Sequence, residues 1–161
     1  MTGLLPTLQE FYGDKLAALL RHQAGARLIG QYDVNNTYQY VVNREETQLT
    51  WLRQAITELG GSVETGVEPV RQASGAGTAR DRVVVEEDIR DAQAFVDRWR
   101  PRVQALSNAR HRTMLGVILG ETLEQKRFFE QAHAGNVDLL GKRTDDVGPR
   151  VGHVRATRWI E

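Results

Sequence analysis

The chain has 161 residues, 40% of them hydrophobic, and its 21 lysines and arginines balance its 21 aspartates and glutamates. This length and apolar content predict a single domain with one hydrophobic core. A formal net charge of zero gives no electrostatic support for a nucleic-acid or membrane-surface partner, and the absence of cysteine excludes disulfides and cysteine-ligated metal sites. No apolar run reaches the roughly 18 residues of a membrane span, and no secretory signal is recognisable, so we expect a soluble cytoplasmic protein.

Two segments in the first half of the chain have the apolar spacing of amphipathic helices. The first covers residues 7–27 and follows Pro6, a residue that suits the first turn of a helix. The second covers residues 34–59 and stops at Gly60, where glycine can adopt the left-handed conformation that closes a helix. The next segment, residues 60–82, has no helical period, and its length favours a crossover between parallel helices over a tight hairpin.

The second half predicts two more helices. Residues 83–85 are expected to add a short extended piece before a third helix at 86–106, which contains Pro101 and should bend or change its ends there. Ser107-Asn108 predicts a break and the N-cap of a fourth helix at 109–134. Residues 136–161 show no period, so we expect an extended C-terminal tail that packs on the bundle or on a partner subunit.

The second predicted helix carries an acid on its apolar side. A rotation of about 100° per residue places Glu45 within the apolar stripe and Gln48 at its edge. The apolar members of this stripe are Tyr38, Val41, Leu49, Leu52, Ile56 and Leu59. Because a buried, unpaired carboxylate is strongly destabilising, Glu45 must be paired, metal-bound, neutral or next to water.

Two motifs resemble the metal-binding segments of ferritin-like proteins of the rubrerythrin and bacterioferritin type. In that family a Glu-x-x-His pair is followed by two apolar residues and often by Leu-Gly-Gly, and this chain has Glu45-x-x-Gln48, then Trp51-Leu52, then Leu59-Gly60-Gly61. The fourth predicted helix is similar, with Glu121-Thr122-Leu123-Glu124-Gln125 before Phe128-Phe129. The resemblance covers about residues 7–134. It implies an all-α, ferritin-like four-helix bundle at residues 1–135, with a long crossover between its second and third helices.

The resemblance also implies a centre for two metal ions, which takes Glu-x-x-His from two helices and a carboxylate from each of the others. Both histidines are missing here. Gln48 stands at the first histidine position, and Gln125 or Glu124 stands at the second, depending on the register of the fourth helix. An amide is a weak ligand for transition metals. The acids expected to point inward are Glu45 and Glu121, with Glu124 as a further candidate.

The four histidines of the chain are not expected to replace the two missing metal ligands. They lie at no Glu-x-x-His or His-x-x-x-His spacing, so we expect surface or capping positions for all of them, namely His22, His111, His133 and His153. We therefore interpret Glu45, Gln48, Glu121 and Gln125 as a metal-free polar core in which the amides donate to the carboxylates. In such a neutral core, Glu45→Gln should be tolerated or stabilising.

The expected function is a structural or binding role in a ferritin-like protein, with no cofactor. The alternative is a metal-binding oxidoreductase or storage protein that holds iron or manganese through Glu45, Glu121 and Glu124, so enzymatic activity stays open. We expect a homo-oligomer, a dimer or larger, and no nucleic-acid or membrane partner. Gly116 and Gly120, four residues apart, indicate either close backbone packing within the chain or a seam between subunits.

Overall fold

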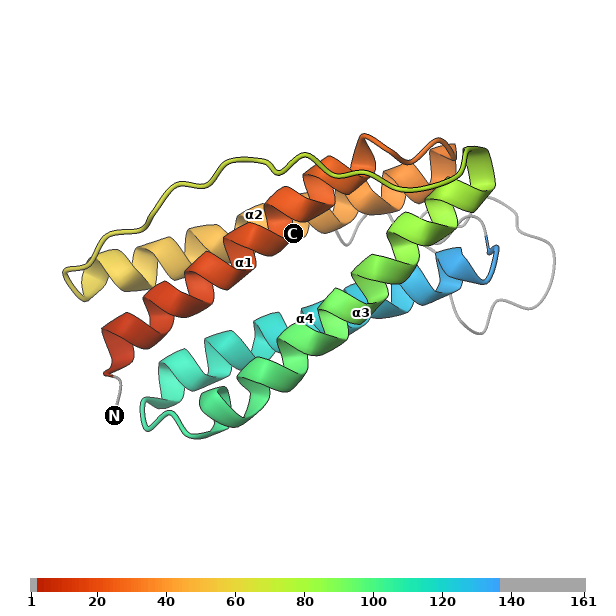
Figure 1. Cartoon of the computed structure of the whole chain (residues 1–161). Helices are drawn as coiled ribbons and strands as arrows, with labels where there is room; N and C mark the ends of the chain where they lie inside the picture. The colour runs from red at the N-terminus through yellow and green to blue at the C-terminus, as the bar shows by residue number, and fades with distance from the viewer. Residues whose placement is uncertain (1–2, 137–161) are drawn as a thin grey trace, which may run out of the picture.

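The computed structural model describes residues 3–136, and these residues form four α-helices and no strand. The helices are α1 (Leu4–Ala26), α2 (Tyr32–Glu58), α3 (Gly77–Gln104) and α4 (Ala109–His133). Figure 1 shows α1 packed along α2 and α3 packed along α4, each as an antiparallel pair. The predicted all-α class with four helices is confirmed. Within residues 3–136, no helix has the length and apolarity that crossing a membrane requires.

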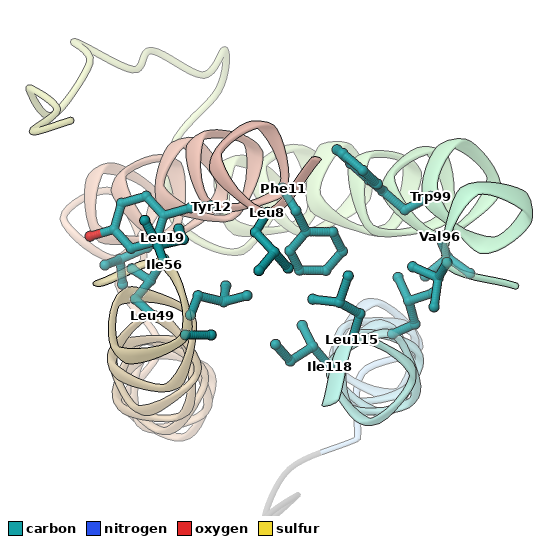
Figure 2. Close-up of a cluster of buried hydrophobic side chains, with 14 of the residues drawn as sticks. Leu8, Phe11, Tyr12, Leu19, Leu49, Ile56, Val96, Trp99, Leu115 and Ile118 are labelled. Carbon is teal, nitrogen blue, oxygen red and sulfur yellow. The ribbon is translucent and has the colours of Figure 1, made fainter. Parts of the chain in front are cut away.

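The core lies between the two helix pairs and contains two apolar clusters. In the larger cluster, Leu8 and Phe11 of α1 point toward Leu115 and Ile118 of α4 (Figure 2). The ring of Phe11 meets that of Trp99 of α3 edge to face, with 4.9 Å between the ring centroids. The smaller cluster is formed by Ala26, Ile29, Val34, Tyr38, Val41, Val84, Val85 and Phe129. The apolar faces of all four helices are therefore packed against one another within one chain.

The start of α3 differs from the prediction. The helix begins at Gly77, nine residues before the predicted start at residue 86, and residues 83–85 are helical where an extended piece was expected. Val84 and Val85 are buried in the smaller cluster, and this packing outweighs the modest helix propensity of valine. Pro101 lies inside α3, which continues to Gln104.

The predicted helix ends elsewhere agree with the structure to within a few residues. Oδ1 of Asn108 accepts a hydrogen bond from the backbone N–H of His111 at 3.0 Å, which confirms the predicted N-cap of α4. Gly60 and Gly135 follow α2 and α4 with φ of 81° and 86°, as the left-handed residues that end helices require. The predicted C-terminal tail, residues 137–161, lies outside the described residues.

Residues 60–76 connect α2 to α3, contain no helix and lie against α1. Figure 1 shows this connection travelling from the C-terminal end of α2 along the molecule to the start of α3. The Gln9 side chain donates to the backbone carbonyl of Ser62 at 2.9 Å. At Gly66 the connection comes so close that a Cβ atom would stand 2.6 Å from Cδ1 of Leu20. A cavity of about 820 Å³ lies between α1 and residues 62–69.

Candidate functional site

Charged and polar side chains from the four helices and from the connection between α2 and α3 meet inside the bundle. We call this set the central charged network, and its members are Lys15, His22, Tyr38, Glu45, Arg71, Asp88 and Thr122. Glu45 lies in the middle and is fully buried, as its position in the apolar stripe of α2 predicts. Its direct partners come from α1, and this changes the chemistry expected from the sequence.

Lys15 places a buried cation at the centre of the bundle. Its Nζ lies 3.1 Å from Oε2 of Glu45 and donates to Oγ1 of Thr122 at 3.3 Å, so the ammonium joins α1 to α2 and α4. The Lys15 side chain is 1% exposed. Its Nζ also lies 5.3 Å from the centre of the Phe95 ring, within the range of a cation–π contact. The aliphatic part of Lys15 thus occupies core space, and the charge is neutralised by Glu45.

His22 connects the carboxylates of α2 and α3. Its Nδ1 lies 2.5 Å from Oε1 of Glu45, and its Nε2 lies 4.0 Å from Oδ1 of Asp88. Asp88 also accepts a hydrogen bond from the hydroxyl of Tyr38. Burial and the neighbouring Asp88 raise the pKa of Tyr38 well above its ordinary value, so Tyr38 stays a neutral donor.

Arg71 brings the connection between α2 and α3 into the network. Its Nη1 donates to Oδ2 of Asp88 at 3.0 Å and to the backbone carbonyl of Arg21 at 3.1 Å, and its Nη2 donates to the carbonyl of Val84 at 3.0 Å. Gly25 makes this position available, because a Cβ at residue 25 would stand 2.5 Å from Nη1 of Arg71. The guanidinium therefore links α1 and α3 through one side chain.

The network favours an ionised Glu45. Burial alone would raise the pKa of Glu45, but the positive charges and hydrogen bonds of His22 and Lys15 outweigh it and hold the pKa below its ordinary value. An ionised carboxylate only accepts hydrogen bonds, so Nδ1 of His22 donates in this contact. The centre is a set of buried ion pairs, in which Glu45 contacts Lys15 and His22 and not the amides expected from the sequence.

The other predicted site residues lie at the side of the bundle, between α2 and α4. Arg44 donates to both oxygens of Glu121, at 2.6 and 2.9 Å, and Gln48 donates to Oε1 of Glu121 at 3.2 Å. Burial raises the pKa of Glu121, but the hydrogen bonds from Arg44 and Gln48 outweigh it and lower the pKa. The Gln48 contact is of the amide-to-carboxylate type predicted from the sequence. Arg44 was not foreseen.

Gln125 and Glu124 are neighbours on α4 but differ in burial. Gln125 is buried, and within residues 3–136 its Nε2 has no hydrogen-bond partner. Glu124 is exposed and pairs with Arg127 on the same helix at 2.5 Å. Glu45, Glu121 and Glu124 thus contact three separate sets of partners. The fourth helix contributes Thr122 and Gln125 to the interior.

Several expectations about charged residues need correction. His22 and His111 are buried, whereas surface or capping positions were expected, and His133 is half-buried, 3.7 Å from Glu86. His153 lies outside the described residues. The inward acids also include Asp88, which the sequence argument missed, and exclude Glu124. The sequence did contain an indication that Lys15 and His22 are buried. Both residues lie on the same face of the first helix as Leu8 and Tyr12, at spacings of three and four residues.

The donor set does not fit a metal centre of the ferritin-like type. Within residues 3–136, no three histidine, aspartate or glutamate side chains are grouped so that they could hold a metal ion. Glu45 is instead neutralised by the ammonium of Lys15, and a metal ion beside Glu45 would face this like charge. Asp88 and Glu121 are neutralised in the same way by Arg71 and Arg44.

Comparisons with known proteins support the fold and do not indicate an activity. No protein family model matches the chain, and no curated protein matches it. The structure is similar to the crystal structure of a protein from Xanthomonas campestris pv. campestris, with a TM-score of 0.56 and 17% sequence identity over 82% of this chain and 88% of that one. At this identity the similarity shows the fold alone.

Proposed function

We propose that this protein is a helical bundle with a structural or binding role, in which a buried lysine has replaced the metal centre of a ferritin-like ancestor. One observation carries the proposal. The ammonium of Lys15 lies between Glu45 and Thr122, in contact with the carboxylate that the resemblance to ferritin-like proteins implies as a metal ligand.

Charge neutrality supports a replacement of this kind. A buried carboxylate needs a counter-charge, and either a metal ion or a protonated side chain can supply it. Lys15 supplies it to Glu45, Arg71 to Asp88 and Arg44 to Glu121, so each of these acids already has a cationic partner. A cation of the protein itself cannot change its oxidation state. This favours a role in binding or scaffolding over oxidation chemistry.

The proposal includes the ferritin-like arrangement of helices and a homo-oligomeric state. The helix order and the long connection between α2 and α3 support the arrangement, because a crossover of this kind joins parallel helices in such bundles. The exposed apolar side chains of Val67, Val70 and Val117 support association.

Metal binding tests the proposal. The full chain is purified without chelator, its metal content is measured by elemental analysis, and its melting temperature is recorded with and without added iron, manganese or zinc. We expect less than stoichiometric metal and an unchanged melting temperature, because a ligand stabilises a protein only when it binds the folded state.

Two variants make this experiment specific to the centre. Glu45→Gln removes the buried carboxylate, and Glu46→Gln removes an exposed carboxylate from the next position on α2 as a matched control. Stoichiometric metal that raises the melting temperature of the wild type and of Glu46→Gln, but not of Glu45→Gln, would refute the proposal. That result would favour the alternative, in which the protein binds a metal as an oxidoreductase or storage protein.

A further inference from the structure

The outer side of α4 has an exposed row of residues that no other described residue covers. Arg112, Gly116, Gly120 and Glu124 follow one another at intervals of four, and all four are exposed. On a helix, residues at this interval form a ridge that is inclined to the helix axis. Ridges of this kind pack into the grooves of a second helix when the two helices cross at about −50°. Val117, beside the row, is 47% exposed.

The two glycines of this row have no role inside the described structure. A Cβ atom added to Gly116 or to Gly120 would meet nothing within 4 Å. Glycine destabilises the interior of a helix relative to alanine, so two exposed glycines weaken α4 without any packing gain within residues 3–136. Close approach of a second backbone would provide that gain, because the absent side chains leave a shallow strip along the helix.

The charges at the two ends of the row identify the occupant. Arg112 lies six residues before Ile118, and Glu124 lies six residues after it, so the row has opposite charges at equal distances from its centre. When two copies of such a row pack antiparallel about a two-fold axis, Arg112 of each copy faces Glu124 of the other. In the same arrangement Gly116 faces Gly120. The row is therefore complementary to itself.

The intramolecular partners of these charged ends leave the pairing available. Arg112 donates to the backbone carbonyl of Leu106 at 2.8 Å and forms no ion pair with another residue of 3–136. Within the described part of the chain, the ion pair of Glu124 is with its neighbour Arg127, three residues further along the same exposed helix surface. Both charged groups lie in solvent, so an intermolecular pair requires little desolvation.

From these observations we infer that the Arg112–Gly116–Gly120–Glu124 row is a self-association surface, on which α4 of a second copy packs antiparallel. The inference rests on the proposed homo-oligomer and specifies its interface. It also accounts for Val117, which would be covered at the edge of the contact.

The first test blocks the close approach. Gly116→Leu and Gly120→Leu add a side chain where the structure has room, so each variant should fold and α4 should gain helix propensity. We expect sedimentation of the full chain to show a dimer for the wild type and a dissociation constant raised about tenfold or more in either variant. Gly13→Leu is the matched control, because Gly13 is an exposed mid-helix glycine of α1 with nothing within 4 Å of its Cβ position.

The second test reverses the charges. Arg112→Glu alone and Glu124→Arg alone each place like charges opposite each other across the two-fold axis, and both should weaken the dimer. The double variant Arg112→Glu/Glu124→Arg restores opposite charges and should recover the dimer. A role of these residues within one chain would not produce this recovery.

Three outcomes would overturn the inference. A wild type that is strictly monomeric would refute both the homo-oligomer and its interface. A dimer that is insensitive to the glycine variants and to the charge reversal would refute this interface alone. A variant whose melting temperature falls while its dissociation constant is unchanged would indicate that the chain's own residues 137–161 occupy the row.

Discussion

Replacing Glu45 by glutamine should destabilise the protein strongly, contrary to the expectation from sequence alone. Glutamine keeps the size of the side chain but removes the only carboxylate among residues 3–136 that contacts the ammonium of Lys15, which is 1% exposed. Removing one member of a buried ion pair typically costs about 3–5 kcal/mol, because the remaining charge is left without compensation. Folded domains are stable by about 5–15 kcal/mol, so the variant should still fold.

The partners of Glu45 make the effect asymmetric. Glu45 contacts both Lys15 and His22, whereas Lys15 has Glu45 as its only carboxylate partner within residues 3–136. Lys15→Met leaves Glu45 with His22 as a donor, so we expect a smaller loss, about 1–3 kcal/mol. The double variant Lys15→Met/Glu45→Gln removes both charges and should be more stable than Glu45→Gln alone.

Urea unfolding followed by far-UV circular dichroism measures these free energies, and the four proteins complete a double-mutant cycle. Glu46→Gln controls for loss of a carboxylate from α2 outside the network. A Glu45→Gln variant within about 0.5 kcal/mol of the wild type, which is the usual range for surface substitutions, would refute the argument. The core around Glu45 would then be neutral and held by hydrogen bonds.

Three further predictions follow from the contacts of single side chains. Gly25→Ala places a Cβ 2.5 Å from Nη1 of Arg71 and should cost about 1–3 kcal/mol in urea unfolding, as overpacked sites do, whereas the same change at exposed Gly13 should be neutral or stabilising. Tyr38→Phe removes a donor from buried Asp88 and should lower the free energy of unfolding by about 1–3 kcal/mol; an unchanged value would mean that water or another donor replaces the hydroxyl. Hydrogen bonds from Arg102, with its charge and that of Arg98, lower the pKa of Glu10 from 4.5 to about 2. The stabilisation from Glu10 is therefore complete above pH 4.5 and is lost as the pH falls through about 2, so in melting experiments Glu10→Gln should show a shallower decline over this interval than the wild type.

The sequence predicted the fold class because its strongest signals are local. Helix ends marked by Asn108, Gly60 and Gly135 depend on a few neighbouring residues, and all three behave as predicted. The start of α3 could not be predicted in this way. Its valine-rich first turns are stabilised by contacts with residues of α1, α2 and α4, which are distant in the sequence.

The burial of Glu45 could be predicted from the sequence, but its partners could not. The apolar stripe of α2 correctly placed Glu45 inside the bundle. Its partners Lys15 and His22 lie on the apolar face of α1, and their spacing indicated this, but a long basic side chain usually extends to solvent, so spacing alone did not decide that Lys15 is buried. Pairing across helices decides which charges are buried, and only the tertiary structure shows it.

The insertion of Arg71 beside Gly25 has a consequence for the order of assembly. The acceptors of its guanidinium belong to α1 and α3, so they come together only after the two helix pairs have packed. We therefore expect the connection between α2 and α3 to dock late in folding. Once docked it should resist local opening, because release of Arg71 would leave the buried Asp88 without its nearest cationic partner. A surface segment of this length would ordinarily be a preferred target for proteases. Here its rate of cleavage should report on the integrity of the interior.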